Sequence, residues 1–206
     1  MSDKAHWDRV YNGRADDALS WFQQDPVRSL ALIEASGAGP EATIIDVGGG
    51  ASRLTANLLN KGFSDLWVLD ISGTALAAAR ESLDADAARI HWVEADVTRV
   101  HLLPAHFDIW HDRAVFHFLT DVTARAAYVA NACAAVKPGG HLIVATFAED
   151  GPEQCSGLPV ARYDAASLQA QFADCFALLH SEKVAHRTPA DKLQWFRYFL
   201  LRRMVV

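Results

Sequence analysis

Short apolar runs alternate with helix-like segments through the middle of this chain, and no other feature restricts its fold as much. Residues 43–47, 66–70 and 90–94 each form a short apolar run that is typical of a buried strand. Residues 52–61 and 73–83 lie between these runs and have the spacing and composition of helices. Strands that are apolar along most of their length and separated by helices predict a mainly parallel sheet with helices on both faces.

The same alternation extends to both sides of this region. A helix is predicted over 26–36, and two further strands over 107–111 and 141–147, with a helix over 122–136 between them. The Lys137-Pro138-Gly139-Gly140 segment predicts a turn immediately before the last of these strands.

The last third of the chain predicts a different arrangement. A helix over 163–172 is followed by two strands, over 176–180 and 193–204, which complete the sheet in antiparallel fashion. Residues 194–203 also fit an amphipathic helix, but their aromatic content favours a strand. We therefore expect an α/β fold with a doubly wound, mainly parallel, seven-stranded sheet and an antiparallel C-terminal strand.

Composition narrows the classes of function. At 206 residues, the chain is long enough for one domain with a full core. Its net charge of -6 and its lack of a stripe of lysine and arginine argue against a nucleic-acid partner. No apolar run suits a signal peptide or a membrane span, so we expect a cytoplasmic protein with no membrane partner. The oligomeric state stays open.

The cysteines predict no special chemistry. Cys133, Cys155 and Cys175 are odd in number and widely separated, so we expect three reduced thiols and neither a disulfide framework nor a metal site.

The segment after the first predicted strand carries a ligand-binding pattern. Gly48, Gly49 and Gly50 remove every Cβ at a point where the backbone must approach a ligand closely. Asp70 ends the next predicted strand, 20 residues after Gly50. In nucleotide-binding sites, an acid at about this spacing from the glycine turn holds a ribose.

Arg53 helps to choose between two kinds of cofactor. It stands where the dinucleotide fingerprint G-x-G-x-x-G has its third glycine, which gives the close helix–strand approach that a pyrophosphate needs. The arginine, together with the lack of any Tyr-x-x-x-Lys pair, disfavours a nicotinamide oxidoreductase. A cofactor without a pyrophosphate tolerates it.

Five motifs in this order resemble the class I S-adenosylmethionine-dependent methyltransferases over roughly residues 40–148. They are the acid Asp46, the glycine turn of Gly48 and Gly50, the acid Asp70, the turn at 95–97, and Lys137-Pro138-Gly139-Gly140. The resemblance implies a Rossmann-like methyltransferase fold and S-adenosyl-L-methionine as the cofactor.

The resemblance also implies roles for single residues. Asp46 lies near the cofactor's amino-acid end, and Asp70 accepts hydrogen bonds from both ribose hydroxyls. Asp96 accepts from the adenine amino group, the next backbone N–H meets a ring nitrogen, and Ile71 and Val97 flank the ring. Gly48, Gly49, Gly50 and Arg53 complete the cofactor site.

We expect one methyltransferase domain over 1–206. Residues 1–25 would form an N-terminal lid, 40–148 the cofactor-binding core, and 149–206 the C-terminal part of the sheet and a substrate cap.

The segment after the fourth strand is the expected mouth of the active site, because ligands of open α/β sheets bind at the carboxyl ends of the strands. Asp112 offers a carboxylate, which we also expect to contact the cofactor, and Arg113 offers a cation. His117 offers a base for a protonated acceptor. The alternative is that Asp112 and Arg113 form a structural ion pair and that His117 only packs.

Trp7, Tyr11 and Trp21 predict an aromatic lid over the cofactor. An aromatic face against a sulfonium cation gains about 0.5–2 kcal/mol. The alternative is a surface helix anchored by these rings. The lid and the segment after the fourth strand resemble thiopurine and thiol methyltransferases, and also a branch of protein lysine methyltransferases.

The expected function is methyl transfer to a small-molecule thiol, hydroxyl or amine, with a protein lysine as the alternative acceptor. Cys155 follows the fifth strand and also suits a soft metalloid or thiol substrate. A partner subunit that binds the cofactor without catalysis is less consistent with three intact acids, Asp46, Asp70 and Asp96.

Overall fold

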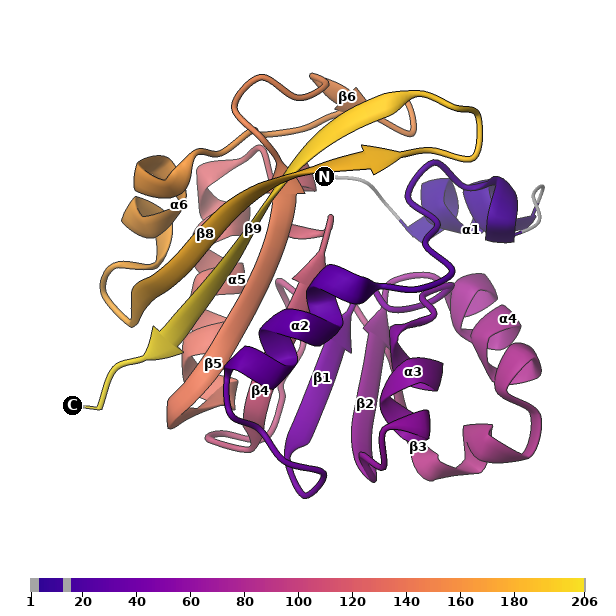
Figure 1. Cartoon of the computed structure of the whole chain (residues 1–206), viewed down its shortest axis with the longest axis horizontal. Helices are drawn as coiled ribbons and strands as arrows, with labels where there is room; N and C mark the ends of the chain where they lie inside the picture. Colours follow the sequence, from indigo (N-terminus) through magenta and orange to yellow (C-terminus); the bar gives the residue numbers. More distant parts are fainter. Residues whose placement is uncertain (1–3, 13–15, 206) are drawn as a thin grey trace.

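The computed structural model describes residues 4–12 and 16–205. A seven-stranded sheet forms its centre, in the order β3-β2-β1-β4-β5-β9-β8 (Figure 1). Its strands are β1 (Thr43–Val47), β2 (Asp65–Asp70), β3 (Ile90–Glu94), β4 (Phe107–Arg113), β5 (Val136–Phe147), β8 (Phe176–Arg187) and β9 (Leu193–Arg203). Neighbours from β3 to β5 are parallel, whereas β9 runs antiparallel to β5 and to β8. The predicted sheet, with its antiparallel C-terminal strand, is confirmed.

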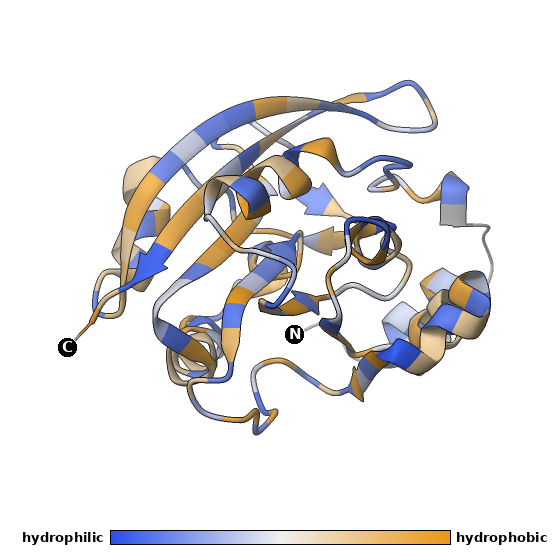
Figure 2. Ribbon diagram, turned by 60° about the horizontal axis from the view of Figure 1, so that its bottom comes forward, coloured by the Kyte–Doolittle hydropathy of each residue, from blue (hydrophilic) through white to orange (hydrophobic). Residues whose placement is uncertain are grey.

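Helices cover both faces of this sheet (Figure 1). They are α1 (Lys4–Asn12), α2 (Val27–Ala35), α3 (Leu54–Asn60), α4 (Gly73–Leu83), α5 (Val122–Ala135) and α6 (Ala165–Phe172). One core cluster joins the sheet to buried residues of α2, α3 and α4, and a second joins it to those of α5 and α6. β1 is buried along its whole length, as its continuous apolar run predicts, and Figure 2 shows hydrophobic residues along the strands and the helix faces.

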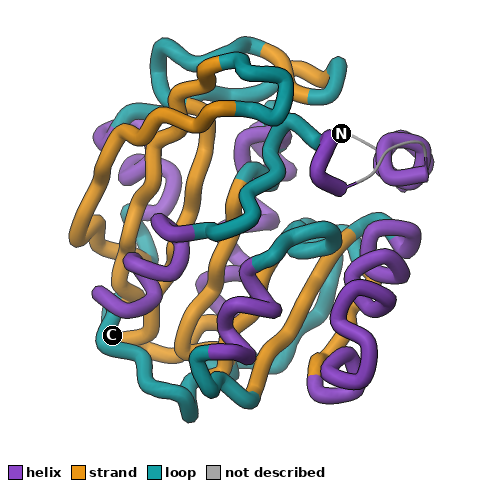
Figure 3. Tube along the Cα trace, turned by 45° about the vertical axis from the view of Figure 1, so that its right-hand side comes forward, coloured by secondary structure: helices purple, strands orange, loops and turns teal. Residues whose placement is uncertain are grey.

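The remaining elements lie in the loops. They are the 3-10 helices η1 (Asp16–Ala18), η2 (Asp84–Arg89) and η3 (Phe116–Phe118), and the two-residue strands β6 (Gln154–Cys155) and β7 (Leu158–Pro159). Figures 1 and 3 both show α1 beyond the carboxyl ends of β1 and β2, above α4. Within the part of the chain that the structure describes, no helix has the length and apolar character needed to cross a membrane.

Three predicted strand boundaries were wrong by two residues or more. β4 ends at Arg113 rather than at residue 111, so Asp112 and Arg113 belong to the strand. β5 begins at Val136 rather than at residue 141, because Val136 pairs with Phe107 of β4 and the Lys137-Pro138-Gly139-Gly140 segment forms an irregularity before the next pair, His141 with Ile109. β8 continues to Arg187 rather than ending at residue 180. It lies at the sheet edge with most residues partly exposed, so its polar side chains hide the strand pattern from the sequence.

The expectation of three reduced thiols was also wrong. Cys133 of α5 and Cys175, just before β8, form a disulfide with their Cα atoms 6.0 Å apart, and Cys155 alone is free. The two cysteines are 42 residues apart in sequence, so only the packing of α5 beside β8 brings them together.

Candidate functional site

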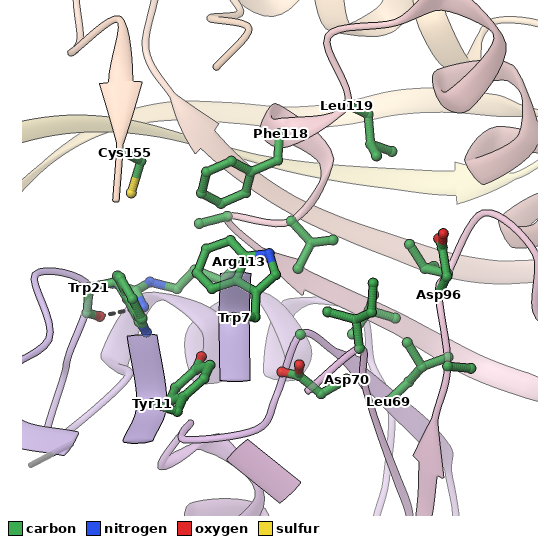
Figure 4. Close-up of a pocket in the computed structure, with 17 residues that line it drawn as sticks. Trp7, Tyr11, Trp21, Leu69, Asp70, Asp96, Arg113, Phe118, Leu119 and Cys155 are labelled. Carbon is green, nitrogen blue, oxygen red and sulfur yellow. Dashed lines mark hydrogen bonds between the residues drawn. The ribbon is translucent and has the colours of Figure 1, made fainter. Parts of the chain in front are cut away.

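The main cavity lies at the carboxyl ends of the parallel strands, between the sheet and α1 (Figure 4). It encloses about 800 Å³ of space, part of which is open to solvent. Its lining comes from α1, the segment before α2, the loops after β1 to β4, and β6: Trp7, Tyr11, Trp21, Val47, Gly48, Leu69, Asp70, Ile71, Ala95, Asp96, Val97, Arg113, Ala114, Val115, Phe118, Leu119 and Cys155. Most of these side chains are apolar, so the few polar ones define where a ligand is oriented.

Asp70 is the buried carboxylate of this cavity. The Gly50 N–H donates to its Oδ2 (3.1 Å), and the Ser72 N–H donates to its Oδ1 (2.8 Å). Its side chain is 5% exposed, and burial raises the pKa of this carboxyl from 3.8 to about 6. Each oxygen keeps a lone pair for a ligand, because a carboxylate oxygen accepts two hydrogen bonds.

The glycine turn packs against neighbouring side chains of the protein, whereas the sequence suggested that its glycines mainly make room for a ligand. A Cβ on Gly48, whose φ is +71°, would lie 2.1 Å from Val115 Cγ2, and one on Gly50 would lie 2.4 Å from Ala75 Cβ. A Cβ on Gly49 would lie 2.6 Å from Asp46 Oδ2. Of the three glycines, Gly48 lines the main cavity, and the other two let the turn pack tightly around the acids.

A second, smaller cavity adjoins the first, because Trp21, Gly48 and Arg113 line both. Asp46 and Arg53 also line it. Asp46 is buried and accepts at Oδ1 from the His111 ring (2.7 Å to Nδ1), while its Oδ2 has no partner. A residue in the lining of the second cavity therefore carries a buried carboxylate oxygen without a hydrogen-bond partner.

Arg113 stands where the two cavities meet. Its Nε donates to the Tyr198 hydroxyl (3.2 Å), and its Nη1 donates to the Trp21 carbonyl (2.7 Å), the bond drawn in Figure 4. Its guanidinium also lies 5.4 Å from the centre of the Phe196 ring. The buried Nη2, which carries two N–H donors, has no hydrogen-bond partner in the structure.

The loop after β3 forms the opposite end of the main cavity. Asp96 Oδ1 accepts from the backbone N–H and the hydroxyl of Thr98 (2.9 and 2.7 Å). The Asn131 side chain of α5 donates to the Val97 carbonyl (2.7 Å), which fixes this loop against the helix. Ile71 and Val97, which we expect to flank the adenine ring, both line the cavity here.

The aromatic residues of the predicted lid lie together over the cavity. The Trp7 ring centre lies 6.0 Å from that of Trp21 and 5.0 Å from that of Phe118, and Tyr11 lies 6.1 Å from Trp21. Of the predicted lid, residues 1–3 and 13–15 lie outside the described chain.

Asp8 attaches α1 to the rest of the molecule, a role that sequence reasoning missed. Its Oδ1 accepts from the Ser72 hydroxyl (2.6 Å), and its Oδ2 from Lys4 Nζ (2.8 Å). These bonds, that from Lys4 first, lower the pKa of Asp8 to about 2. Ser72 is also the N-cap of α4 and donates to Asp70, so α1 is tied directly to the site.

The placement of Asp112 does not support its predicted contact with substrate or cofactor. Asp112 is fully buried, and its carboxylate accepts from the Val115 N–H (2.8 Å), the Phe116 N–H (3.0 Å) and the Tyr128 hydroxyl (2.6 Å). It does not pair with Arg113, whose hydrogen bonds go to Tyr198 and Trp21. Asp112 instead shapes the loop between β4 and η3.

The placement of His117 does not support its predicted role as a base. The ring is fully buried between Phe118 and Phe147 and is not part of either cavity wall. Burial, and then the charge of Arg113, lower its pKa to about 3. A histidine of this pKa that has no surface on the cavity is a packing residue.

Cys155 does reach the main cavity, where burial raises the pKa of its thiol. Cys133 lies in the disulfide, away from the cavity lining. Among residues 4–12 and 16–205, no group of three or more His, Cys, Asp or Glu side chains is arranged to hold a metal ion.

Ser29, His111 and Tyr198 also belong to the two sites but were not predicted. His111 and Asp46 are register partners on adjacent strands β1 and β4. Aligning the carboxyl ends of neighbouring predicted strands would have revealed His111, because paired residues point to the same face. Nothing in the local sequence of Ser29 or Tyr198 indicates their contacts.

Comparison with known proteins gives a family match over the region that forms the site. Residues 44–140 match the model of the family described as "Methyltransferase domain". The ubiquinone/menaquinone biosynthesis C-methyltransferase UbiE of Shewanella halifaxensis is 29% identical over 121 residues, 57% of this chain and 47% of that protein. That of Vibrio parahaemolyticus is 28% identical over 139 residues. The chain spans about half the length of the curated relatives it matches.

Solved structures show the same fold over nearly the whole chain. One similar structure was solved in work on the conversion of a disulfide bond into a thioacetal group during echinomycin biosynthesis. Its TM-score is 0.80 at 20% sequence identity, and the match covers 98% of this chain and 93% of that chain. The 1,6-didemethyltoxoflavin-N1-methyltransferase of Burkholderia thailandensis, with S-adenosylhomocysteine bound, has a TM-score of 0.71 at 20% identity, covering 98% and 84%. The matched residues 44–140 and the shared fold make this chain similar to S-adenosylmethionine-dependent methyltransferases.

Proposed function

We propose that this chain transfers a methyl group from S-adenosylmethionine to a small-molecule acceptor. The observation that carries the proposal is Asp70, a buried carboxylate in the wall of the main cavity whose two oxygens are oriented by the glycine turn and the start of α4. Two fixed acceptor oxygens on one side chain match the two hydroxyls of a ribose.

The side chains that line the two cavities match the successive parts of this cofactor. Ile71 and Val97 provide apolar walls for adenine, with Asp96 at the edge, and Asp70 serves the ribose. The second cavity holds two buried unpartnered atoms of opposite character, Asp46 Oδ2 and Arg113 Nη2. An α-amino acid group carries an ammonium and a carboxylate, so it satisfies both.

The bound cofactor supplies an activated methyl group on a sulfonium, and the protein's task is mainly to position the acceptor and exclude water. Trp7, Tyr11, Trp21 and Phe118 form the apolar cover over the cavity. Positioning of reactants in a closed site is worth roughly 7–11 kcal/mol of the barrier.

Neither His117 nor Cys155 is placed and tuned to remove a proton from the acceptor, and we assign the carboxylate of Asp70 to the ribose. His117 is enclosed, and the raised pKa of Cys155 keeps its thiol protonated near neutral pH. We therefore infer that the acceptor atom enters as a competent nucleophile, such as a thiolate, an enolate or a neutral amine.

A small acceptor is supported by the enclosed, aromatic character of the cavity under α1. Two similar proteins are named for small molecules: UbiE is a C-methyltransferase of ubiquinone/menaquinone biosynthesis, and the Burkholderia enzyme is a 1,6-didemethyltoxoflavin-N1-methyltransferase. A lysine side chain on a protein is the alternative acceptor.

Calorimetric titration with S-adenosylmethionine, S-adenosylhomocysteine and NADH tests the cofactor. We expect binding of the first two only, with Asp70→Ala reducing the affinity by at least about tenfold, as for loss of a charge-assisted hydrogen bond. NADH binding, or an unaffected Asp70→Ala variant, would contradict the proposal.

Labelled methyl donor then locates the acceptor. The protein is incubated with the tritiated cofactor and either the small-molecule or the protein fraction of a cell extract. We expect label in the small-molecule fraction. Label in the protein fraction alone would establish the alternative acceptor class.

A further inference from the structure

Three buried polar side chains from three different elements meet at the wall of the second cavity. Ser29 comes from α2, Asp46 from β1 and His111 from β4, and their exposed fractions are 1%, 3% and 2%. The His111 ring lies between the other two, 2.7 Å from Asp46 Oδ1 through Nδ1 and 2.8 Å from Ser29 Oγ through Nε2.

The geometry of this hydrogen-bond network indicates which atoms donate and which accept. An ionised carboxylate can only accept, so Nδ1 of His111 donates to Asp46. In the tautomer with its proton on Nδ1 alone, Nε2 accepts from the Ser29 hydroxyl. The order Ser29, His111, Asp46 therefore fixes the imidazole at both nitrogens and the carboxylate at one oxygen.

This series of hydrogen bonds ends at an oxygen that has no hydrogen-bond partner of its own. Asp46 lines the second cavity, and its Oδ2 is buried without a partner. A Cβ on Gly49 would lie 2.6 Å from this oxygen, so glycine at that position keeps the space beside it free. A buried carboxylate oxygen without a hydrogen bond is costly, which is unexpected for a purely structural polar cluster.

We propose that Ser29 and His111 are positioning residues that hold Asp46 so that its Oδ2 receives the α-ammonium group of the cofactor. The inference rests on the proposed use of S-adenosylmethionine and adds two residues that do not touch it. It also links α2 to the cofactor, because Ser29 of α2 is the first residue of the hydrogen-bonded series Ser29, His111 and Asp46. Partners that orient a ligating group typically change ligand affinity by about 10- to 100-fold when removed, as documented for metal ligands.

Two ligands separate this role from a general structural one. S-adenosylhomocysteine carries the amino-acid end, whereas 5′-deoxy-5′-methylthioadenosine has the same adenosine and thioether without it. Both are titrated calorimetrically into the whole chain. We expect His111→Phe to weaken S-adenosylhomocysteine by about tenfold or more and to change methylthioadenosine by less than about twofold.

Conservative variants extend the test. His111→Asn keeps an N–H near the position of Nδ1 and should retain most of the affinity for S-adenosylhomocysteine, and Ser29→Ala should cause a smaller selective loss than His111→Phe. His141→Phe is the matched control, because His141 pairs with Ile109 near the other end of β4. If His111→Phe does not fold, the ratio of the two affinities in Ser29→Ala decides.

If His111→Phe and Ser29→Ala leave the ratio of the two affinities unchanged, because both ligands lose affinity equally or not at all, the proposed positioning role is contradicted. Failure of the unmodified protein to bind either ligand would instead overturn the proposed cofactor. These outcomes are distinguishable in the same set of titrations.

Discussion

Asp70 is an acid that the fold keeps buried and oriented at the same time. Its pKa of about 6 reflects burial, which outweighs the N–H donors of Ser72 and Gly50 that favour the charged form. Without cofactor, this raised pKa stabilises the folded chain only at acidic pH. The contribution is complete below the ordinary value of 3.8 and is lost as the pH rises through about 6.

The effect of pH on cofactor binding should have the opposite sign. Only the ionised carboxylate accepts from both ribose hydroxyls, so affinity should fall as the pH falls through about 6, approaching tenfold per pH unit below it. Calorimetric titration with S-adenosylhomocysteine from pH 5 to pH 8 measures this. Asp70→Asn should bind more weakly at pH 8 and show a flatter profile. A wild-type affinity that is constant from pH 5 to pH 8 would contradict the assignment.

His117 gives a prediction of no effect. With a pKa near 3 and no surface on the cavity, it stays neutral at every pH at which the protein is assayed. His117→Gln should therefore leave the shape of the rate profile between pH 5.5 and pH 9 unchanged. Disappearance of a titrating limb in this variant would restore His117 as the base.

The loop between β4 and η3 is an element held by one carboxylate. Asp112 accepts three hydrogen bonds in a fully buried position, and the Tyr128 hydroxyl that donates one of them accepts in turn from Trp110 Nε1 (2.9 Å). This network places Val115 and Arg113 at the cavity. Its effect on the site is indirect, through the shape of the loop.

Removing this network should affect stability before chemistry. Asp112→Ala should lower the free energy of unfolding by about 3 kcal/mol, and Tyr128→Phe by about 1–2 kcal/mol, since each leaves buried groups without partners. Urea denaturation measures both values, and the double variant should lose less than their sum because the two residues share a bond. Strict additivity would argue that the bond contributes nothing.

Helix α1 is the second element with a testable attachment. Asp8 holds it to Ser72, and the lowered pKa means that this contact is fully present above pH 3.8 and is lost only as the pH falls through about 2. The contact therefore persists at neutral pH.

Releasing α1 should weaken cofactor binding without unfolding the core. Because exposed ion pairs contribute about 0.2–1 kcal/mol, we expect Asp8→Ala to raise the Kd for S-adenosylhomocysteine about two- to fivefold. Tryptophan fluorescence reports on this, since Trp7 and Trp21 both line the cavity. Arg9→Ala, an exposed change on the same helix, is the control. Equal effects of the two variants would remove the special role of Asp8.

At the scale of the whole molecule, the site is assembled from segments that are far apart along the chain. The cavity takes its walls from α1, β1 to β4 and β6, so a ligand in it joins the N-terminal helix, the sheet and the loop after β5. Such a ligand should stabilise the molecule as a unit.

A thermal shift measures that stabilisation. S-adenosylhomocysteine at one hundred times its Kd should add about 2.7 kcal/mol, which corresponds to a rise in Tm of roughly 5–10 °C for a chain of this size. NADH at the same concentration should leave the Tm unchanged. An equal rise with both nucleotides would indicate a site that does not distinguish them.

The sheet, the order of its central elements and the acids at their ends can all be predicted from local sequence patterns. Local periodicity marks buried strands such as Thr43–Val47, and a strand end followed by glycine or an acid marks the ligand edge, because parallel strands end on the same side. Asp70, Ile71 and Val97 were therefore found from the sequence, and the structure places all three in one cavity.

Only the tertiary structure decided which neighbouring polar residues reach that cavity and which support it from within. Arg113 faces the cavity while Asp112 beside it is buried, and Ser29 meets His111 although 82 residues separate them. Side-chain direction along β4 and the burial of each group depend on contacts between distant segments. Local sequence carries the type of a residue, but its pKa, partners and access to a ligand arise only when those segments pack.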